Sequence, residues 1–318
     1  MDDQRSRPQI TSLGERLARG DFVFTAEITP PVSAGPNDLL TKALPLRGVV
    51  DAVNVTDGAS ARVHMSSVAA AATLVANGIE PIVQFTCRDR NRIALISDLL
   101  GASALGIQNL LILRGDDPTK GDQPQAKAVF DLESAELIEI AHDMSATGTI
   151  PSSQMDDAGE ITVAARDLQS RPEFFIGAAD MPSAVPDERW LAGLRAKINA
   201  GATFIQTQLC YDVDLITKYA AILRDEGLTE HIHVLIGNGP LPSVKSAIWM
   251  RDNLFGVAMP ESVIERLDRS ADAKAEGIDI CVEQIEAMSS IEGISGVHLM
   301  APINTQSIPA VVANFRNA

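Results

Sequence analysis

The feature that most constrains the fold is an alternation of short apolar runs with longer helical patterns along the whole chain. Eight apolar runs have the length of strands, and glycines such as Gly78 and Gly227 stand where the helices between them should stop. The predicted strands are Phe22–Ile28, Ala52–Thr56, Glu80–Thr86, Ile107–Leu113, Phe174–Ala178, Phe204–Gln208, His233–Ile236 and Gly296–Leu299. Eight strand–helix units predict a (β/α)₈ TIM barrel. An open doubly wound sheet is the alternative, because periodicity does not distinguish a closed sheet from an open one.

Helical patterns fill the spaces between these runs, and two stretches interrupt the alternation. The predicted helices are Ser66–Asn77, Asn91–Leu100, Ser134–Met144, Asp187–Ala200 and Leu215–Asp225. Thr147–Arg171 is rich in Ser, Asp and Gly and predicts an irregular surface insertion before the fifth strand. Ala258–Ser290 predicts one long helical region before the last strand, covering the barrel or a neighbouring subunit. We therefore expect an N-terminal arm over residues 1–21 and a single barrel domain over residues 22–318.

Charge and composition exclude several classes of function. The formal net charge of −16 argues against general binding to nucleic acid or to acidic membranes, although one anionic cofactor can still be held in a locally positive pocket. The three cysteines (Cys87, Cys210 and Cys281) form no CxxC pair, which indicates a reducing, cytoplasmic setting and no thiolate metal site. The N-terminus has no apolar segment typical of a signal peptide, and no run is long enough to span a bilayer. An acidic surface with a long helical region is compatible with a homo-oligomer.

Polar residues follow each predicted strand, at the end where barrels carry their chemistry. The clearest case is the turn Arg114-Gly115-Asp116-Asp117-Pro118, placed directly after the apolar run Leu110–Leu113. Comparable residues end the other strands: Glu27, Thr56-Asp57-Gly58-Ala59, Gln84 with Thr86, Asp180, Gln206-Thr207-Gln208, Gly237-Asn238-Gly239, and His298 with Asn304. The sequence therefore predicts a site at the carboxyl end of the barrel.

Each of these residues also has a purely structural interpretation. Glu27 lies among apolar residues, where a carboxylate is costly unless it is paired or protonated; this suits a general acid but also a salt-bridge partner. Asp116 is equally explained as a turn residue bonding its own backbone. Gln208 fits a core amide, and His298 fits a hydrogen-bonded core residue better than a metal ligand. No metal site is expected.

Six fragments, taken in order, resemble the methylenetetrahydrofolate reductase family between about Phe22 and His298. Each lies at a predicted strand end or its neighbouring helix. The fragments are Phe24-Thr25-Ala26-Glu27-Ile28-Thr29-Pro30-Pro31, Val55-Thr56-Asp57-Gly58-Ala59, Gln84-Phe85-Thr86-Cys87, Leu113-Arg114-Gly115-Asp116, Lys197-Ile198-Asn199-Ala200-Gly201-Ala202 and Gln206-Thr207-Gln208. The resemblance implies a (β/α)₈ barrel that holds FAD and transfers hydride from NADH or NADPH to 5,10-methylenetetrahydrofolate.

The resemblance also implies roles for single residues. Glu27 matches the general acid that protonates N10 of the folate, and Asp116 matches an Asp that contacts the pterin near the flavin. Gln208 matches an amide that bonds the pterin. The flavin contacts implied are Thr56, Gly58, Ala59, Gln84, Arg114, Gly115, Phe130, Ala178 and Lys197.

Some positions depart from the family pattern, which keeps other functions open. Gln84 stands where relatives often carry His, and Asp57 and Phe130 stand where they often carry Tyr. One alternative is a flavin-independent reductase with direct hydride transfer from the nicotinamide. Others are a folate-binding methyltransferase barrel and an accessory subunit without catalysis.

Overall fold

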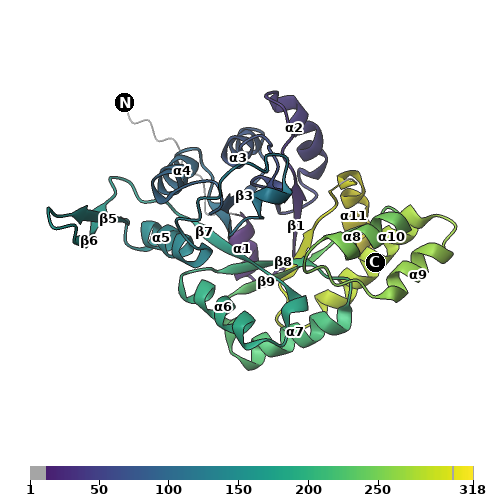
Figure 1. Cartoon of the computed structure of the whole chain (residues 1–318). Helices are drawn as coiled ribbons and strands as arrows, with labels where there is room; N and C mark the ends of the chain where they lie inside the picture. The colour runs from purple at the N-terminus through teal and green to yellow at the C-terminus, as the bar shows by residue number, and fades with distance from the viewer. Residues whose placement is uncertain (1–11, 303, 318) are drawn as a thin grey trace, which may run out of the picture.

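The computed structural model describes residues 12–302 and 304–317, so residues 1–11 of the expected N-terminal arm lie outside the described residues. Its centre is a closed barrel of parallel strands in which β1 pairs with both β2 and β10 (Figure 1). The barrel strands are β1 (Val23–Ile28), β2 (Ala52–Val55), β3 (Pro81–Thr86), β4 (Asn109–Leu113), β7 (Phe175–Asp180), β8 (Phe204–Leu209), β9 (His233–Asn238) and β10 (Gly296–Leu299). This confirms the predicted (β/α)₈ barrel and excludes the open sheet.

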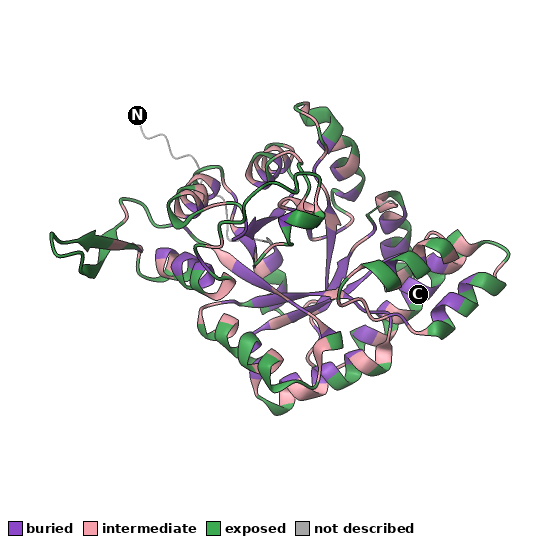
Figure 2. Ribbon diagram, viewed as in Figure 1, coloured by how far each residue is buried: buried purple, intermediate pink, exposed green. Residues whose placement is uncertain are grey.

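Helices surround the barrel, and all but α1, which lies at its amino end, are arranged around its outside. They are α1 (Ser12–Ala18), α2 (Pro36–Ala43), α3 (Ser67–Ala76), α4 (Arg92–Ala104), α5 (Ser134–Ala146), α6 (Glu188–Asn199), α7 (Val213–Asp225), α8 (Val244–Asn253), α9 (Glu261–Arg269), α10 (Ala273–Ser289) and α11 (Ile308–Asn317). The strands are buried on both faces, whereas the helices bury one side and expose the other (Figure 2). This explains why the strands appear in the sequence as continuous apolar runs and the helices as periodic patterns.

Helix α1 closes the amino end of the barrel. Its Leu13 and Leu17 are buried and pack with residues at the starts of the strands, among them Val23, Ile82 and Phe204. Part of the segment predicted to be an N-terminal arm therefore contributes to the barrel interior. The polar side chains of the barrel interior lie toward the opposite, carboxyl end.

The insertion before β7 is an ordered hairpin and not the irregular loop that the sequence predicts. Strands β5 (Thr149–Met155) and β6 (Ile161–Asp167) pair antiparallel, with Met155 opposite Ile161, and project from the barrel (Figure 1). At the turn, Asp156 Oδ1 accepts hydrogen bonds from the Ala158 and Glu160 amides. Both faces of most of the hairpin are exposed, so its sequence has no apolar alternation to reveal the strands. Because it connects α5 to β7, it lies at the amino end of the barrel.

The single long helical region expected over Ala258–Ser290 is two helices, α9 and α10. The break falls where Asp272 caps α10, its Oδ1 accepting hydrogen bonds from the Lys274 and Ala275 amides. Both helices pack with α8 around a separate apolar cluster that includes Leu241 and Leu267. Across the described ranges, no helix is long and apolar enough to cross a membrane.

Candidate active site at the carboxyl end of the barrel

Side chains that alternate along the strands point into the barrel and form layers. The apolar layer against α1 contains Val23, Ala52 and Ile82, so residues two and four positions further along these strands share the same face. In this interior series the residues become polar toward the carboxyl end: Thr25 and Glu27 on β1, Asn54 on β2 with Thr56 after it, and Gln84 with Thr86 on β3. The sequence thus changes from apolar to polar along the barrel axis.

Glu27 lies in the uppermost polar layer, with its side chain 21% exposed. Gln84 Nε2 donates a hydrogen bond of 3.0 Å to Glu27 Oε2. His298 Nε2 lies 3.7 Å from the same oxygen. Within the described residues, no hydrogen bond is made to Glu27 Oε1. The carboxyl group therefore has one oxygen held by the barrel and one available to a ligand.

A chain of buried hydrogen bonds continues below Glu27. His298 Nδ1 lies 2.9 Å from Thr25 Oγ1, and Gln206 Nε2 donates to Thr25 Oγ1 at 3.0 Å. Gln206 and Asn54 exchange reciprocal amide hydrogen bonds across the barrel. Since buried polar groups are costly when unpaired, this network is what allows a polar interior in the barrel.

Arg88 connects the loops that follow β2, β3 and β4. Its side chain is almost fully buried, donates two hydrogen bonds to Asp89 and reaches the carbonyl of Gly58. Gly58 has a φ of 61°, and a Cβ there would lie 2.4 Å from Arg88 Nη2. Gly115 has a φ of 94°, and a Cβ there would lie 2.9 Å from Arg88 Cβ. Both turns therefore need glycine, because of their backbone conformation and their closeness to Arg88.

Asp57 is engaged by the end of β3. It accepts hydrogen bonds from the Thr86 amide and hydroxyl and from Arg90, which also pairs with Asp98. At the position where relatives often carry Tyr, this chain thus has a carboxylate that ties the loop after β2 to the loop after β3.

Arg114, Phe130 and Asp116 lie around the loop after β4. The Arg114 guanidinium stacks over the Phe130 ring at 4.2 Å and lies 3.6 Å from Glu133. Phe130 has a φ of 41°, an uncommon conformation for an aromatic residue. Asp116 is exposed at the same end of the barrel as Glu27, but in the described part of the chain no hydrogen bond joins the two. The structure places them at one end without bringing them into contact.

Gln208 lies in a bulge of β8 beside the loop after α8. The bulge falls between Gln206 and Leu209 in the pairing with β9. Gln208 Nε2 donates to the Phe255 carbonyl at 3.0 Å, and its Oε1 accepts from the Leu209 amide. The Phe255 side chain is 82% exposed. The amide predicted to bind the pterin is thus held by local backbone groups.

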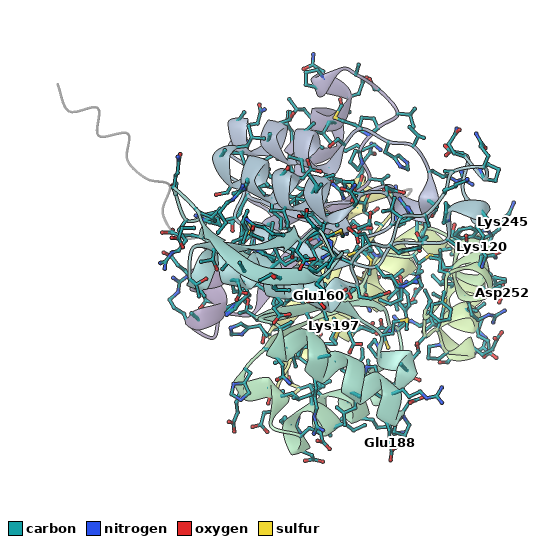
Figure 3. All side chains as sticks on the ribbon, turned by 60° about the vertical axis from the view of Figure 1, so that its left-hand side comes forward. Lys120, Glu160, Glu188, Lys197, Lys245 and Asp252 are labelled. Atoms are coloured by element: carbon teal, nitrogen blue, oxygen red, sulfur yellow. The ribbon has the colours of Figure 1, made fainter. Side chains whose placement is uncertain are left out.

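Lys197 on α6 lies against the end of β7. Its Nζ donates to the Ala179 carbonyl at 2.7 Å, and burial lowers the pKa of this amine, although nearby Asp180 opposes the shift. Figure 3 shows Lys197 toward the middle of the molecule, whereas Glu188, at the other end of α6, lies at its edge. A half-buried amine thus lies against the end of β7 in a protein that carries a net negative charge.

Asp180 is buried between α6 and α7. It accepts hydrogen bonds from Trp190 Nε1 and from the Tyr219 hydroxyl. Burial raises the pKa of the Asp180 carboxyl from its ordinary value, and the Tyr219 hydrogen bond acts in the opposite direction.

Among the other expected flavin contacts, Thr56 is the residue whose side chain most clearly lacks a hydrogen-bond partner. Its Oγ1 is buried without a hydrogen-bond partner in the described residues, at the end of β2 next to Gly58 and Ala59. The Ala178 methyl, by contrast, packs in the apolar core outside the barrel. An orphaned hydroxyl, an irregular loop after β2 and the nearby cations fit an anionic, hydrogen-bonding cofactor.

The cysteines do not contribute reactive groups. All three are buried, and burial raises the pKa of Cys87 to about 11 and that of Cys210 to about 12. The residues that the structure describes contain no cluster of three or more His, Cys, Asp or Glu side chains able to hold a metal ion.

The strand-end residues are predictable from the sequence, but the polar residues beneath them were missed. Thr25 and Asn54 were not selected, and His298 was interpreted only as a hydrogen-bonded core residue. The signal was present: Thr25 lies two residues before Glu27 and Asn54 two residues before Thr56, so each shares the inward face of the residue that follows it. Arg88 and Arg90 were also missed, although two arginines directly after a buried strand need partners.

The family model and the related proteins found by comparison agree on one family. The profile of the family described as methylenetetrahydrofolate reductase matches residues 12–316. A Saccharomyces cerevisiae protein named methylenetetrahydrofolate reductase 2 is 26% identical over 266 residues, covering 80% of this chain and 39% of the relative. A rice protein (Oryza sativa subsp. japonica) named probable methylenetetrahydrofolate reductase (NADH) is 26% identical over 320 residues, covering 96% of this chain and 50% of the relative. The chain thus spans about half or less of the length of these relatives.

Solved structures of low sequence identity share the fold. A Clostridium thermocellum protein described as binding two copies of 5-methyl-5,6,7,8-tetrahydrofolic acid superposes with a TM-score of 0.66. It is 12% identical, and the match covers 96% of this chain and 99% of that one. DmoA from Hyphomicrobium sulfonivorans superposes with a TM-score of 0.58 at 11% identity, over 93% of this chain and 88% of that one.

Proposed function

We propose a function from one premise: this chain belongs to the methylenetetrahydrofolate reductase family. The function is the reduction of 5,10-methylenetetrahydrofolate to 5-methyltetrahydrofolate with NADH or NADPH. The observation that carries the proposal is the Glu27 carboxyl group, half-buried at the carboxyl end of the barrel with Oε2 held by Gln84 and Oε1 free of bonds to the described residues. A carboxyl group in this setting suits proton donation to a bound ligand.

Glu27 would act as the general acid. It donates a proton to N10 of the folate, the bond from the methylene carbon to N10 breaks, and the electron pair of that bond stays on N10. The methylene carbon is left as an iminium ion with N5. Hydride addition to this carbon then gives the methyl group. A closed aminal accepts hydride poorly, so the proton transfer makes the reduction feasible.

FAD is the cofactor that the residues at this end fit best. When bound, it would take hydride from the nicotinamide and supply it to the folate. Thr56, with its unpartnered hydroxyl, and the turns at Gly58-Ala59 and Arg114-Gly115 would hold it together with Phe130 and Lys197. The Arg114 and Lys197 charges would offset the anionic groups of the cofactor.

Asp116 and Gln208 would orient the pterin. The exposed Asp116 carboxylate would favour the cationic iminium ion, and Gln208 would exchange its bond to the Phe255 carbonyl for bonds to the pterin. Asp116→Asn is expected to weaken folate reduction while flavin remains bound, measured by steady-state assay and by the flavin absorbance. Loss of the flavin together with activity would contradict this role.

The decisive experiment combines a spectrum with a variant of Glu27. The purified protein should absorb near 450 nm, bleach with NADH or NADPH, and then reduce 5,10-methylenetetrahydrofolate. In Glu27→Gln, bleaching should survive while folate turnover falls about 10²–10⁴-fold, the usual contribution of general acid catalysis. Glu139→Gln, at an exposed position on α5, is the matched control and should behave as wild type.

Other outcomes identify the alternatives. A colourless protein that still oxidises the nicotinamide with folate would be a flavin-independent reductase. A protein that binds folate but oxidises neither nucleotide would be a methyltransferase barrel or an accessory subunit, and the proposal would fail. Equal loss of both half-reactions in Glu27→Gln would make Glu27 a structural residue.

A further inference from the structure

The interior of the barrel below Glu27 contains a polar chain whose direction can be worked out. Its members come from strands far apart in the sequence: Thr25 and Glu27 on β1, Asn54 on β2, Gln206 on β8 and His298 on β10. Thr25 and His298 face each other in the pairing of β1 with β10. His298 is 2% exposed, so its imidazole has no solvent to satisfy it and depends on these neighbours.

At the end of the chain farthest from Glu27, the side-chain amides of Gln206 and Asn54 determine which atoms donate hydrogen bonds. Gln206 Nε2 uses one hydrogen on Asn54 Oδ1 and the other on Thr25 Oγ1, while Gln206 Oε1 accepts from Asn54. Thr25 Oγ1 therefore accepts one bond and has a single hydrogen of its own to donate.

The hydrogen of Thr25 has two acceptors within reach, and their distances decide between them. His298 Nδ1 lies 2.9 Å from Thr25 Oγ1, whereas the Val297 carbonyl oxygen lies 3.4 Å away. The shorter contact is in the range of a good O–H···N bond and the longer one is not. Thr25 thus donates to Nδ1, which places the proton of a neutral His298 on Nε2, toward Glu27.

Two N–H groups then converge on one oxygen of Glu27. Gln84 Nε2 donates to Oε2 at 3.0 Å, and His298 Nε2 faces the same Oε2 at 3.7 Å. Oε2 thus accepts the Gln84 hydrogen bond and also faces the His298 N–H, so an acidic proton on Oε2 would point toward two donors. That proton belongs on Oε1, the atom free of bonds to the described residues.

We propose that His298 is a positioning residue for Glu27: oriented by Thr25, it reserves Oε2 as the accepting oxygen and leaves Oε1 to deliver the proton to the substrate. This inference rests on the function proposed above. When the proton leaves Oε1 for folate N10, the negative charge that remains is shared with Oε2, where both N–H groups stabilise it. The bonds from Gln206 to Thr25 and from Thr25 to His298 donate in the same direction, toward Glu27, so each strengthens the next.

The first test reads the imidazole directly and needs no turnover. In protein labelled with ¹⁵N-histidine, His298 should show a protonated Nε2 and an unprotonated Nδ1. Thr25→Val should move the proton toward Nδ1, and Glu27→Gln should shift the Nε2 resonance, with His233 as an internal reference outside the chain. A wild-type His298 protonated on Nδ1, or a Nε2 resonance unmoved in Glu27→Gln, would overturn the inference.

The second test separates positioning from folding. His298→Gln and Thr25→Val should each lower kcat for folate reduction about tenfold or more, part of the 10²–10⁴-fold that a general acid supplies, with KM little changed. Thr25→Ser, which keeps the hydroxyl, should recover most of that loss. Reduction of an artificial electron acceptor by the nicotinamide should be unaffected, and His233→Asn should match wild type throughout.

The outcomes distinguish this inference from the proposed function. If wild type does not reduce methylenetetrahydrofolate, the proposed function fails, while the resonances still report on the hydrogen-bond chain. If wild type is active and Glu27→Gln is not, but His298→Gln and Thr25→Val keep full kcat, the positioning role is wrong. Should His298→Gln fail to fold, the comparison of Thr25→Val with Thr25→Ser decides.

Discussion

At the scale of single residues, Arg88 connects the loops at the carboxyl end of the barrel more extensively than any exposed arginine there. It joins Asp89 and the Gly58 carbonyl, and both Gly58 and Gly115 pack against it. Arg88→Lys keeps the charge but loses the planar fork, so it should lower the free energy of unfolding by about 1–3 kcal/mol.

The control for Arg88→Lys is Arg92→Lys on the surface. Arg92 bonds Asp131 in a similar way but is 54% exposed, and exposed pairs contribute about 0–1 kcal/mol. Urea titration of both variants measures the difference. Equal destabilisation would show that burial of Arg88 has no special effect.

Asp180 should lower the free energy of unfolding as pH rises, which is the reverse of the usual effect of a carboxyl group. Burial raises the pKa of its carboxyl in the folded protein, so the folded state binds this proton more tightly than the unfolded state. The contribution to stability is complete below about pH 4 and is lost as pH rises through the folded pKa. Asp180→Asn should remove this loss and flatten the dependence of the unfolding free energy on pH, measured by urea titration from about pH 4 to 7.

Asp131 has a pKa shifted in the opposite direction, so its effect on stability should have the opposite dependence on pH. The hydrogen bond from Arg92 lowers the pKa of Asp131 in the folded protein, so its contribution is present at neutral pH and is lost as pH falls. Asp131→Asn should therefore reduce stability at neutral pH and have little effect in acid. If Asp180→Asn behaves in the same way, the assignment of a raised pKa to Asp180 is wrong.

At the scale of elements, the sequence predicts the barrel strands better than the segments that connect them. All eight barrel strands are where the apolar runs predict them, because strands buried on both faces carry that signal locally. The hairpin of β5 and β6 is missed since exposed strands carry none. The break between α9 and α10 depends on the single cap at Asp272, which a helical period does not reveal.

The hairpin should be dispensable for folding and catalysis. Apart from Ile150, its residues contribute little buried surface, and it joins the barrel at the end opposite Glu27. Replacing residues 152–164 by a short Gly-Ser linker should leave the thermal midpoint and folate turnover close to wild type. A large drop in the midpoint would show that the distal hairpin supports the fold.

At the scale of the whole molecule, the barrel interior is apolar at its amino end and polar toward its carboxyl end. Leu17→Ala, beneath the apolar layer, should lower the unfolding free energy by about 2–5 kcal/mol, with kcat of the folded protein unchanged. Leu105→Ala, at a position 49% exposed, should have a much smaller effect. Denaturant titration and steady-state assays measure both. A fall in kcat for Leu17→Ala would show that the two ends are coupled.

The same scale explains which part of the site was predictable. Glu27, Asp116 and Gln208 were selected because strand ends share one face of any barrel. The contact between Glu27 and His298 joins the first strand to the last, and it exists only because the sheet closes. No local pattern encodes such a contact, whereas the family resemblance marks the strand ends without the network that supports them.

The outward-reaching ribbon of β5 and β6 has a practical consequence. A dye or a surface tether attached near Gly159 would stand clear of the protein body, and the hairpin joins the barrel at the end opposite the proposed site. Single immobilised molecules could then be assayed for the proposed turnover, with the carboxyl end of the barrel turned toward the solution.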